Sequence, residues 1–232
     1  MRTTSRLAID ADVPASVTRT RVWLALAIAS FAVFVVLAVL VAGHVALPFD
    51  QSLLDSARTM GGPDSLWRLL SDAANIPLIV IGVGMVLWLL WKGRRREAIL
   101  VIIVLVAATA GSEAVKQLVG RPRPLGTDPA IPGVVYSFPS GHVLEAGTIF
   151  GIIGIMVWRG WWPLAAKSLV AIVFTIFVLL VAVARVALAE HYPSDVLAGL
   201  LAGIGDLSIF AAFSQPRPSD RADERGARPE TG

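Results

Sequence analysis

Six long apolar segments constrain the fold of this chain more than any other feature. They cover about 22–47, 77–91, 98–119, 142–158, 164–188 and 196–213. A helix needs about 20 mostly apolar residues to cross the hydrocarbon core of a bilayer, and fewer when polar side chains at its ends reach the interface. The chain is 56% hydrophobic and only 16% charged, a balance that does not suit a soluble domain. We therefore predict an all-α integral membrane protein whose six transmembrane helices form a bundle.

The distribution of basic residues predicts how this bundle is oriented. Six spans place both termini on one side, and basic residues gather in the segment 1–21 and in the gaps after the second and fourth spans. The positive-inside rule assigns these regions to the cytoplasm, with a tail at 214–232 whose composition predicts disorder. Most tryptophans flank the same side, as an aromatic belt does: Trp23, Trp88, Trp91, Trp158, Trp161 and Trp162. We expect a multi-pass protein of the cell membrane with one domain at 22–213.

The remaining connections then face outside. The longest, 48–76, contains an apolar cluster among charged residues at 66–70, which predicts a short amphipathic helix at the membrane interface. Gly61, Gly62 and Pro63 separate this helix from an earlier piece. The other two connections, 120–141 and 189–195, contain polar and titratable residues of the kinds that bind ligands or catalyse reactions.

Composition excludes several kinds of site. The chain has no cysteine, so disulfides and thiolate metal sites are excluded. Its net charge of +3 and isoelectric point near 9.8 are compatible with nucleic-acid binding. However, the positive charges lie between apolar segments, which is typical of topology signals. We expect no nucleic-acid partner.

Three polar motifs converge on the predicted outer face. They are Lys116 with Arg123 seven positions later, Pro139-Ser140-Gly141-His142, and Arg185 followed by His191 and Asp195 at offsets of six and four. Singly, each has an ordinary explanation, because basic residues near span ends are usually interfacial anchors and a serine before a helix is usually an N-cap. Together, three cations would repel one another unless an anion lies between them. A phosphate fits two arginine forks and a lysine, and Ser140 with the first amides of the fourth span would add donors.

The histidines extend this interpretation from binding to catalysis. A neutral imidazole can attack phosphorus, and a protonated one can give a proton to a leaving oxygen. Asp195 lies four residues after His191, so its carboxylate is within reach of the ring and can fix the tautomer.

These motifs closely resemble those of the type 2 phosphatidic acid phosphatase superfamily, membrane lipid phosphatases related to vanadium haloperoxidases. The family signatures K-x6-R-P, P-S-G-H and S-R-x5-H-x3-D match in order and spacing, except that Ala184 stands where the family usually has serine. The resemblance implies that His191 is the nucleophile, that Asp195 orients it and that His142 protonates the leaving alkoxide and later activates water. It also implies a phosphate site made of Lys116, Arg123, Ser140, Gly141 and Arg185, with no metal or cofactor.

Other polar residues lie inside the predicted spans. Glu145, one turn after His142, is interpreted either as a structural hydrogen-bonding residue or as a modulator of His142. Asp206 lies near the predicted midplane, where a carboxylate needs a partner or a proton. Glu113 is expected to pair with Lys116 at i,i+3. His44 matches no motif. Gly199, Gly203 and Gly205 predict close helix packing in the last span.

We predict hydrolysis of a membrane lipid phosphomonoester or diphosphate at the outer face, through a phosphohistidine. Polyprenyl diphosphate is the first candidate, because an outward-facing site suits a carrier released there. Phosphatidic acid and phosphatidylglycerol phosphate are the alternatives, since the motifs bind the phosphate that all three share. Two other classes stay open, a lipid phosphotransferase and a non-catalytic lipid-binding or transport protein. The intact histidines and Asp195 argue against the second class.

Overall fold

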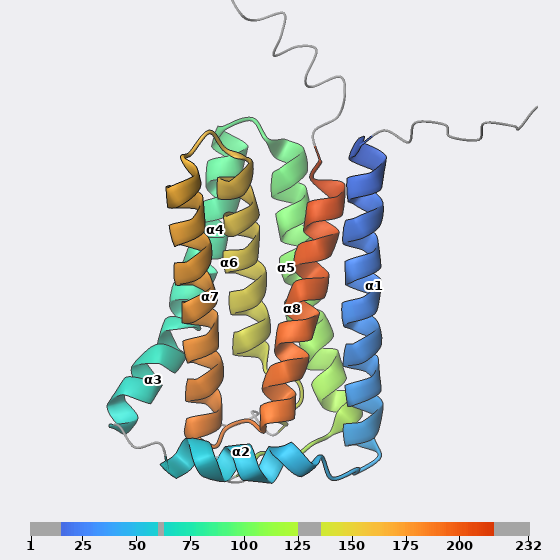
Figure 1. Cartoon of the computed structure of the whole chain (residues 1–232), viewed down its shortest axis with the longest axis vertical. Helices are drawn as coiled ribbons and strands as arrows, with labels where there is room; N and C mark the ends of the chain where they lie inside the picture. The colour runs from blue at the N-terminus through green and yellow to red at the C-terminus, as the bar shows by residue number, and fades with distance from the viewer. Residues whose placement is uncertain (1–14, 60–62, 125–135, 216–232) are drawn as a thin grey trace, which may run out of the picture.

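The computed structural model describes residues 15–59, 63–124 and 136–215, and in these ranges every named element is a helix. The helices are α1 (Ala15–Ala42), α2 (Pro48–Thr59), α3 (Asp64–Ala73), α4 (Ile76–Trp91), α5 (Arg95–Val119), α6 (Gly141–Arg159), α7 (Leu164–Ala187) and α8 (Pro193–Phe213). Six helical stretches, with α3 and α4 counted as one, are long and apolar enough to cross a bilayer. The predicted six-span helical bundle is therefore confirmed (Figure 1). The predicted disordered tail lies almost wholly outside the described residues.

The first span differs most from its predicted range. α1 begins at Ala15 and ends at Ala42, whereas the apolar pattern predicted 22–47. The helix ends early because the chain turns at His44, whose φ of 56° is left-handed, before α2 begins at Pro48. Apolarity continues past the end of the helix, so the pattern alone could not locate this turn.

Two short helices occupy the predicted loop at 48–76. α3 confirms the predicted amphipathic helix around 66–70. α2 corresponds to the piece that was expected before the Gly-Gly-Pro break but was not assigned a structure. It crosses one end of the bundle (Figure 1) and buries Asp50, Leu54 and Ala57. This end of the bundle carries the motifs described below.

The last span is the most buried of the six, and it packs against α1 and α6. A Cβ added at Gly199 would lie 2.6 Å from the carbonyl oxygen of Ser140, and one at Gly205 would lie 2.6 Å from the ring of Phe31 in α1. Side chains at these positions would separate the helices. The close packing predicted from the glycines of this span is thus confirmed.

Candidate active site

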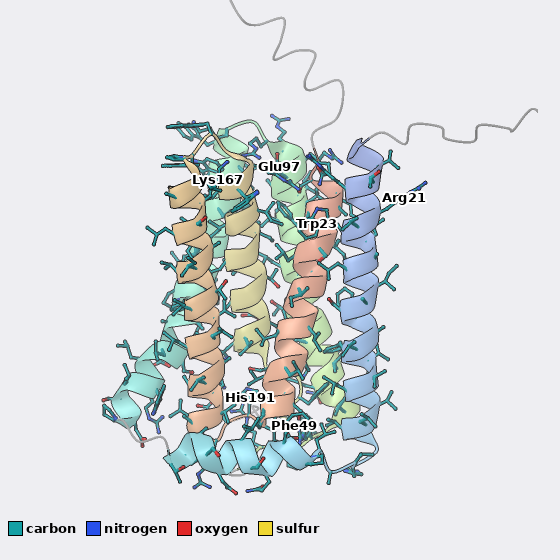
Figure 2. All side chains as sticks on the ribbon, viewed as in Figure 1. Arg21, Trp23, Phe49, Glu97, Lys167 and His191 are labelled. Atoms are coloured by element: carbon teal, nitrogen blue, oxygen red, sulfur yellow. The ribbon has the colours of Figure 1, made fainter. Side chains whose placement is uncertain are left out.

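Hydrogen bonds between main-chain atoms join the three motifs at the end of the bundle that α2 crosses. The Ser137 amide donates to the Arg121 carbonyl at 2.9 Å, and the Ser140 amide donates to the Asp195 carbonyl at 3.0 Å. Between them, Phe138 is fully buried in an apolar cluster with residues of α1 and α8. The loop before α6 is therefore fixed on both sides. Figure 2 places His191 and Phe49 of α2 at this end.

The His191 ring is held in one tautomer. It is only 2% exposed, and its Nδ1 lies 2.7 Å from the carbonyl oxygen of Ser137. A carbonyl can only accept, so Nδ1 carries the hydrogen and Nε2 keeps a lone pair. Burial lowers the pKa of His191 to about 4; the Asp195 carboxylate opposes this shift, and the positive charge of Arg185 adds to it. The neutral ring is therefore the form present at pH 7, and it can act as a nucleophile through Nε2.

Asp195 lies beside His191, as its spacing predicts, but its hydrogen bonds go elsewhere. Its Oδ2 is 3.7 Å from Nδ1 of His191, which is too long for a hydrogen bond, and accepts from the Tyr192 amide at 2.8 Å. Its Oδ1 accepts from Arg121 at 2.6 Å. The Ser137 carbonyl, rather than the expected carboxylate, thus sets the tautomer here. Asp195 supplies a negative charge next to the ring.

A network that the sequence did not reveal holds Asp195 in place. Arg121 donates to Asp195, to Oδ2 of Asp50 at 2.7 Å and to Oγ of Ser194 at 2.7 Å. Asp50 also accepts from the amide and hydroxyl of Ser194. Burial disfavours the charge on Arg121, but Asp195 and Asp50 outweigh this and raise its pKa. Asp50 is 71 positions from Arg121 and 144 from Ser194, and no spacing pattern signals contacts of that range.

Arg123 and Arg185 come from different motifs and meet at one carboxylate oxygen. Oε2 of Glu190 accepts from Nη1 of Arg123 at 3.1 Å and from Nη2 of Arg185. Nη1 of Arg185 donates to Oγ of Ser71 in α3 at 2.6 Å. The Nε atoms of both arginines and Oγ of Ser140 are buried without a hydrogen-bond partner among the described residues. Buried donors without partners are costly, so these atoms indicate a site for an anion with several oxygens.

Lys116 and His142 border the same cluster. A Cβ added at Gly141 would lie 3.7 Å from Nζ of Lys116, so the lysine reaches the first turn of α6. Nζ also pairs with Glu113 at 3.2 Å, which confirms the predicted i,i+3 pair. His142 follows Gly141 in the first turn of α6, the turn that Lys116 reaches. The structure thus brings the eight residues predicted to be catalytic or phosphate-binding to one end of the bundle.

Comparison with known proteins identifies the family of this chain. The model of the PAP2 superfamily matches residues 97–219, more than half of the chain. The chain belongs to the PAP2 superfamily. It is 26% identical over 193 residues to phosphatidylglycerophosphatase B of Bacillus subtilis, covering 80% of this chain and 93% of that protein. The resemblance drawn from the three motifs is therefore confirmed.

Two solved structures share the fold of this PAP2 member. One is a transmembrane PAP2 type phosphatidylglycerolphosphate phosphatase from Bacillus subtilis, with a TM-score of 0.64 and 19% identity; the alignment covers 87% of this chain and 97% of that one. The other is LpxE of Aquifex aeolicus, with a TM-score of 0.54 and 21% identity, covering 71% and 95%. Both are aligned over nearly their whole length, so each shares the helical fold of the part of this chain that it covers.

The structure also places the other residues that the sequence singled out. Glu145 of α6 accepts from Thr109 of α5 at 3.1 Å, the structural hydrogen bond between spans that was one of its two interpretations. Asp206 is buried within α8. Ala184, where the PAP2 motif usually has serine, is fully buried.

The described residues contain no group of three or more His, Cys, Asp or Glu side chains that could hold a metal ion. The donors left unpaired in the cluster are guanidinium and hydroxyl groups, which suit an anion.

Proposed function

We propose that this PAP2 member hydrolyses a lipid phosphomonoester through a phosphohistidine on His191, with phosphatidylglycerol phosphate as the first candidate and phosphatidic acid as the second. One observation carries the proposal: a buried neutral imidazole with a free Nε2 lies next to guanidinium and hydroxyl donors that have no partner among the described residues. The named activity of the Bacillus relatives supports the order of candidates. Polyprenyl diphosphate, the first candidate from the sequence, now ranks below both.

The mechanism follows from the placement of the groups. Arg123, Arg185 and Lys116 bind the phosphate oxygens, and Oγ of Ser140 donates to one more. Nε2 of His191 attacks phosphorus and the bond from phosphorus to the lipid oxygen breaks. The negative charge of the bound phosphate offsets the surrounding cations and favours protonated His142, which gives its proton to that oxygen. The negative charge of Asp195 stabilises the positive charge that the attacking ring acquires.

The second half of the reaction restores the enzyme. Neutral His142 takes a proton from water, whose oxygen attacks the phosphorus of the phosphohistidine. The bond from phosphorus to Nε2 then breaks, which releases inorganic phosphate and returns His191 to its neutral form. No step requires a metal ion, so we propose a metal-independent hydrolase whose substrate reaches the outer end of the bundle from the membrane.

The test measures phosphate release by the detergent-purified protein in the presence of EDTA. Phosphatidylglycerol phosphate, phosphatidic acid and polyprenyl diphosphate are each supplied as substrate. His191→Ala is expected to lose activity by about a thousandfold or more, because no other group replaces the nucleophile. His44→Ala is the matched control: it removes the same side chain from an exposed turn and should retain full activity.

Each contrary outcome has a definite meaning. Release that EDTA abolishes would contradict metal independence, and undiminished release by His191→Ala would contradict the phosphohistidine. Release that depends on an added lipid or sugar acceptor would identify a phosphotransferase instead. A preference for polyprenyl diphosphate would restore the first candidate from the sequence.

A further inference from the structure

Glu190 occupies the position that a phosphate oxygen would take between two arginines. Its Oε2 accepts from Arg123 at 3.1 Å and also from Arg185. The side chains of these arginines are 12% and 4% exposed, whereas that of Glu190 is 30% exposed. The carboxylate therefore approaches the buried cations from the open side of the cluster. An anion that binds Nη1 of Arg123 and Nη2 of Arg185 together must displace it.

The backbone directs Glu190 toward this position. Ala189, the preceding residue, has a φ of 51°, a left-handed conformation that non-glycine residues seldom adopt. The amides of Glu190 and His191 both donate to the Arg185 carbonyl at 3.2 Å. The turn after α7 thus folds back on Arg185, which brings the carboxylate and the nucleophilic ring to the same cation. Glu190 is tied to the site by the main chain as well as by its side chain.

Displacement of this carboxylate depends on the charge of the incoming phosphate. A phosphodiester carries one negative charge, so exchanging it for the carboxylate leaves the charge between the arginines unchanged. A phosphomonoester carries about 1.5 to 2 negative charges at pH 7. It therefore gains attraction from both arginines when the carboxylate leaves. The surrounding membrane consists mostly of phosphodiester lipids, which would otherwise compete for the site.

We propose that Glu190 is a specificity-determining residue that competes with monoanionic phosphodiester lipids for Arg123 and Arg185, while dianionic phosphomonoesters displace it. This inference rests on the proposed function, because it assumes that both arginines bind the substrate phosphate. Glu190 is not a proton donor or nucleophile in this scheme. It determines how much negative charge a phosphate group must carry to bind between the two arginines.

The experiment replaces the carboxylate by its neutral isostere. In Glu190→Gln, the Kd for dioctanoyl phosphatidylglycerol, a phosphodiester, is expected to fall about tenfold in calorimetric titration, which corresponds to about 1.4 kcal/mol. The same lipid should become a correspondingly stronger inhibitor of dioctanoyl phosphatidic acid hydrolysis, so the ratio of its Ki to the KM of the substrate falls.

Glu113→Gln is the matched control. It removes the same charge from the partner of Lys116, but Glu113 is 58% exposed and contacts neither arginine. Its Kd for the phosphodiester should stay within about twofold of wild type, because exposed pairs contribute little.

Three outcomes would overturn the proposal. The Kd could be unchanged in Glu190→Gln, it could fall equally in Glu113→Gln, or it could rise in Glu190→Gln. The last result would mean that Glu190 only positions the arginines. The Kd is measured without turnover, so it tests the role of Glu190 even if the protein hydrolyses none of the lipids. A lack of hydrolysis would contradict the proposed function and leave this binding test intact.

Discussion

His191 combines burial of its ring with a free lone pair on Nε2. A buried imidazole avoids charge, and a carbonyl at Nδ1 leaves Nε2 unprotonated. Asp195 lies 3.7 Å away and favours the protonated ring, while Arg185 disfavours it. The balance keeps the nucleophile in its reactive form without a separate base. Arg121 contributes to this balance indirectly, because it donates a hydrogen bond to Oδ1 of Asp195, which would otherwise be free.

This balance predicts how His191 titrates. Its pKa of about 4 lies below the ordinary value of 6.5, so the folded protein should keep this ring neutral down to about pH 4. The unfolded chain binds a proton near pH 6.5 and the folded protein does not. The stability contributed by the neutral ring is therefore complete above pH 6.5 and is lost as the pH falls from 6.5 toward 4.

The measurement is an NMR titration of the imidazole signals in detergent micelles. The chain has only three histidines, so comparison with His191→Ala identifies the signal. A midpoint near 6.5 for His191 would contradict the burial and partners described above.

At the scale of the helices, the contact between α6 and α8 positions the serine of the second motif. Gly199 of α8 lies against the Ser140 carbonyl, and the Ser140 amide donates to the Asp195 carbonyl in the first turn of α8. The same pair of helices therefore fixes Ser140, His142 and Asp195 relative to one another. Small residues along α8 make this approach possible.

Gly199→Ala should disturb both stability and activity. The added Cβ would lie 2.6 Å from the Ser140 carbonyl oxygen, which is backbone and cannot rotate away. Overpacking of this kind costs about 1–3 kcal/mol. We expect a lower midpoint of denaturation in mixed micelles and a lower kcat/KM.

Gly84→Ala is the control for this prediction, because an added Cβ there has no atom within 4 Å among the described residues. It should be neutral or slightly stabilising, since alanine favours a helix over glycine by about 1 kcal/mol. Equal behaviour of the two variants would show that the α6–α8 contact has no special role.

The helices also show what the sequence could and could not predict. Hydrophobic length identified the six spans, and motif spacing identified eight residues that the structure brings to one end. α2 was not assigned, because a short polar helix has no apolar run of its own. Its residue Asp50 reaches Arg121 and Ser194 across long sequence separations, so the contact depends on the folded bundle. Glu190 carried a local signal, an acidic residue directly before His191, but its two partners required the structure.

For the whole molecule, the candidate site and most of the interfacial basic residues lie at opposite ends. Figure 2 shows His191 and Phe49 at one end and Arg21, Glu97 and Lys167 at the other. The described ends of α1 and α8 that lead to the two termini lie together at the end away from α2 (Figure 1). Because the basic residues gather at one end of the bundle, the positive-inside rule predicts one orientation in the membrane, with that end in the cytoplasm.

Cysteine labelling tests this orientation directly. The chain has no cysteine, so each introduced thiol is unique. Ser52→Cys on α2 and Arg95→Cys at the start of α5 place an exposed thiol at the two ends of the bundle. In intact cells, a membrane-impermeant maleimide should label Ser52→Cys, and Arg95→Cys should react only after the membrane is permeabilised. The reverse pattern would place the site in the cytoplasm, where the substrate would have to come from the inner leaflet and the products would be released inside the cell.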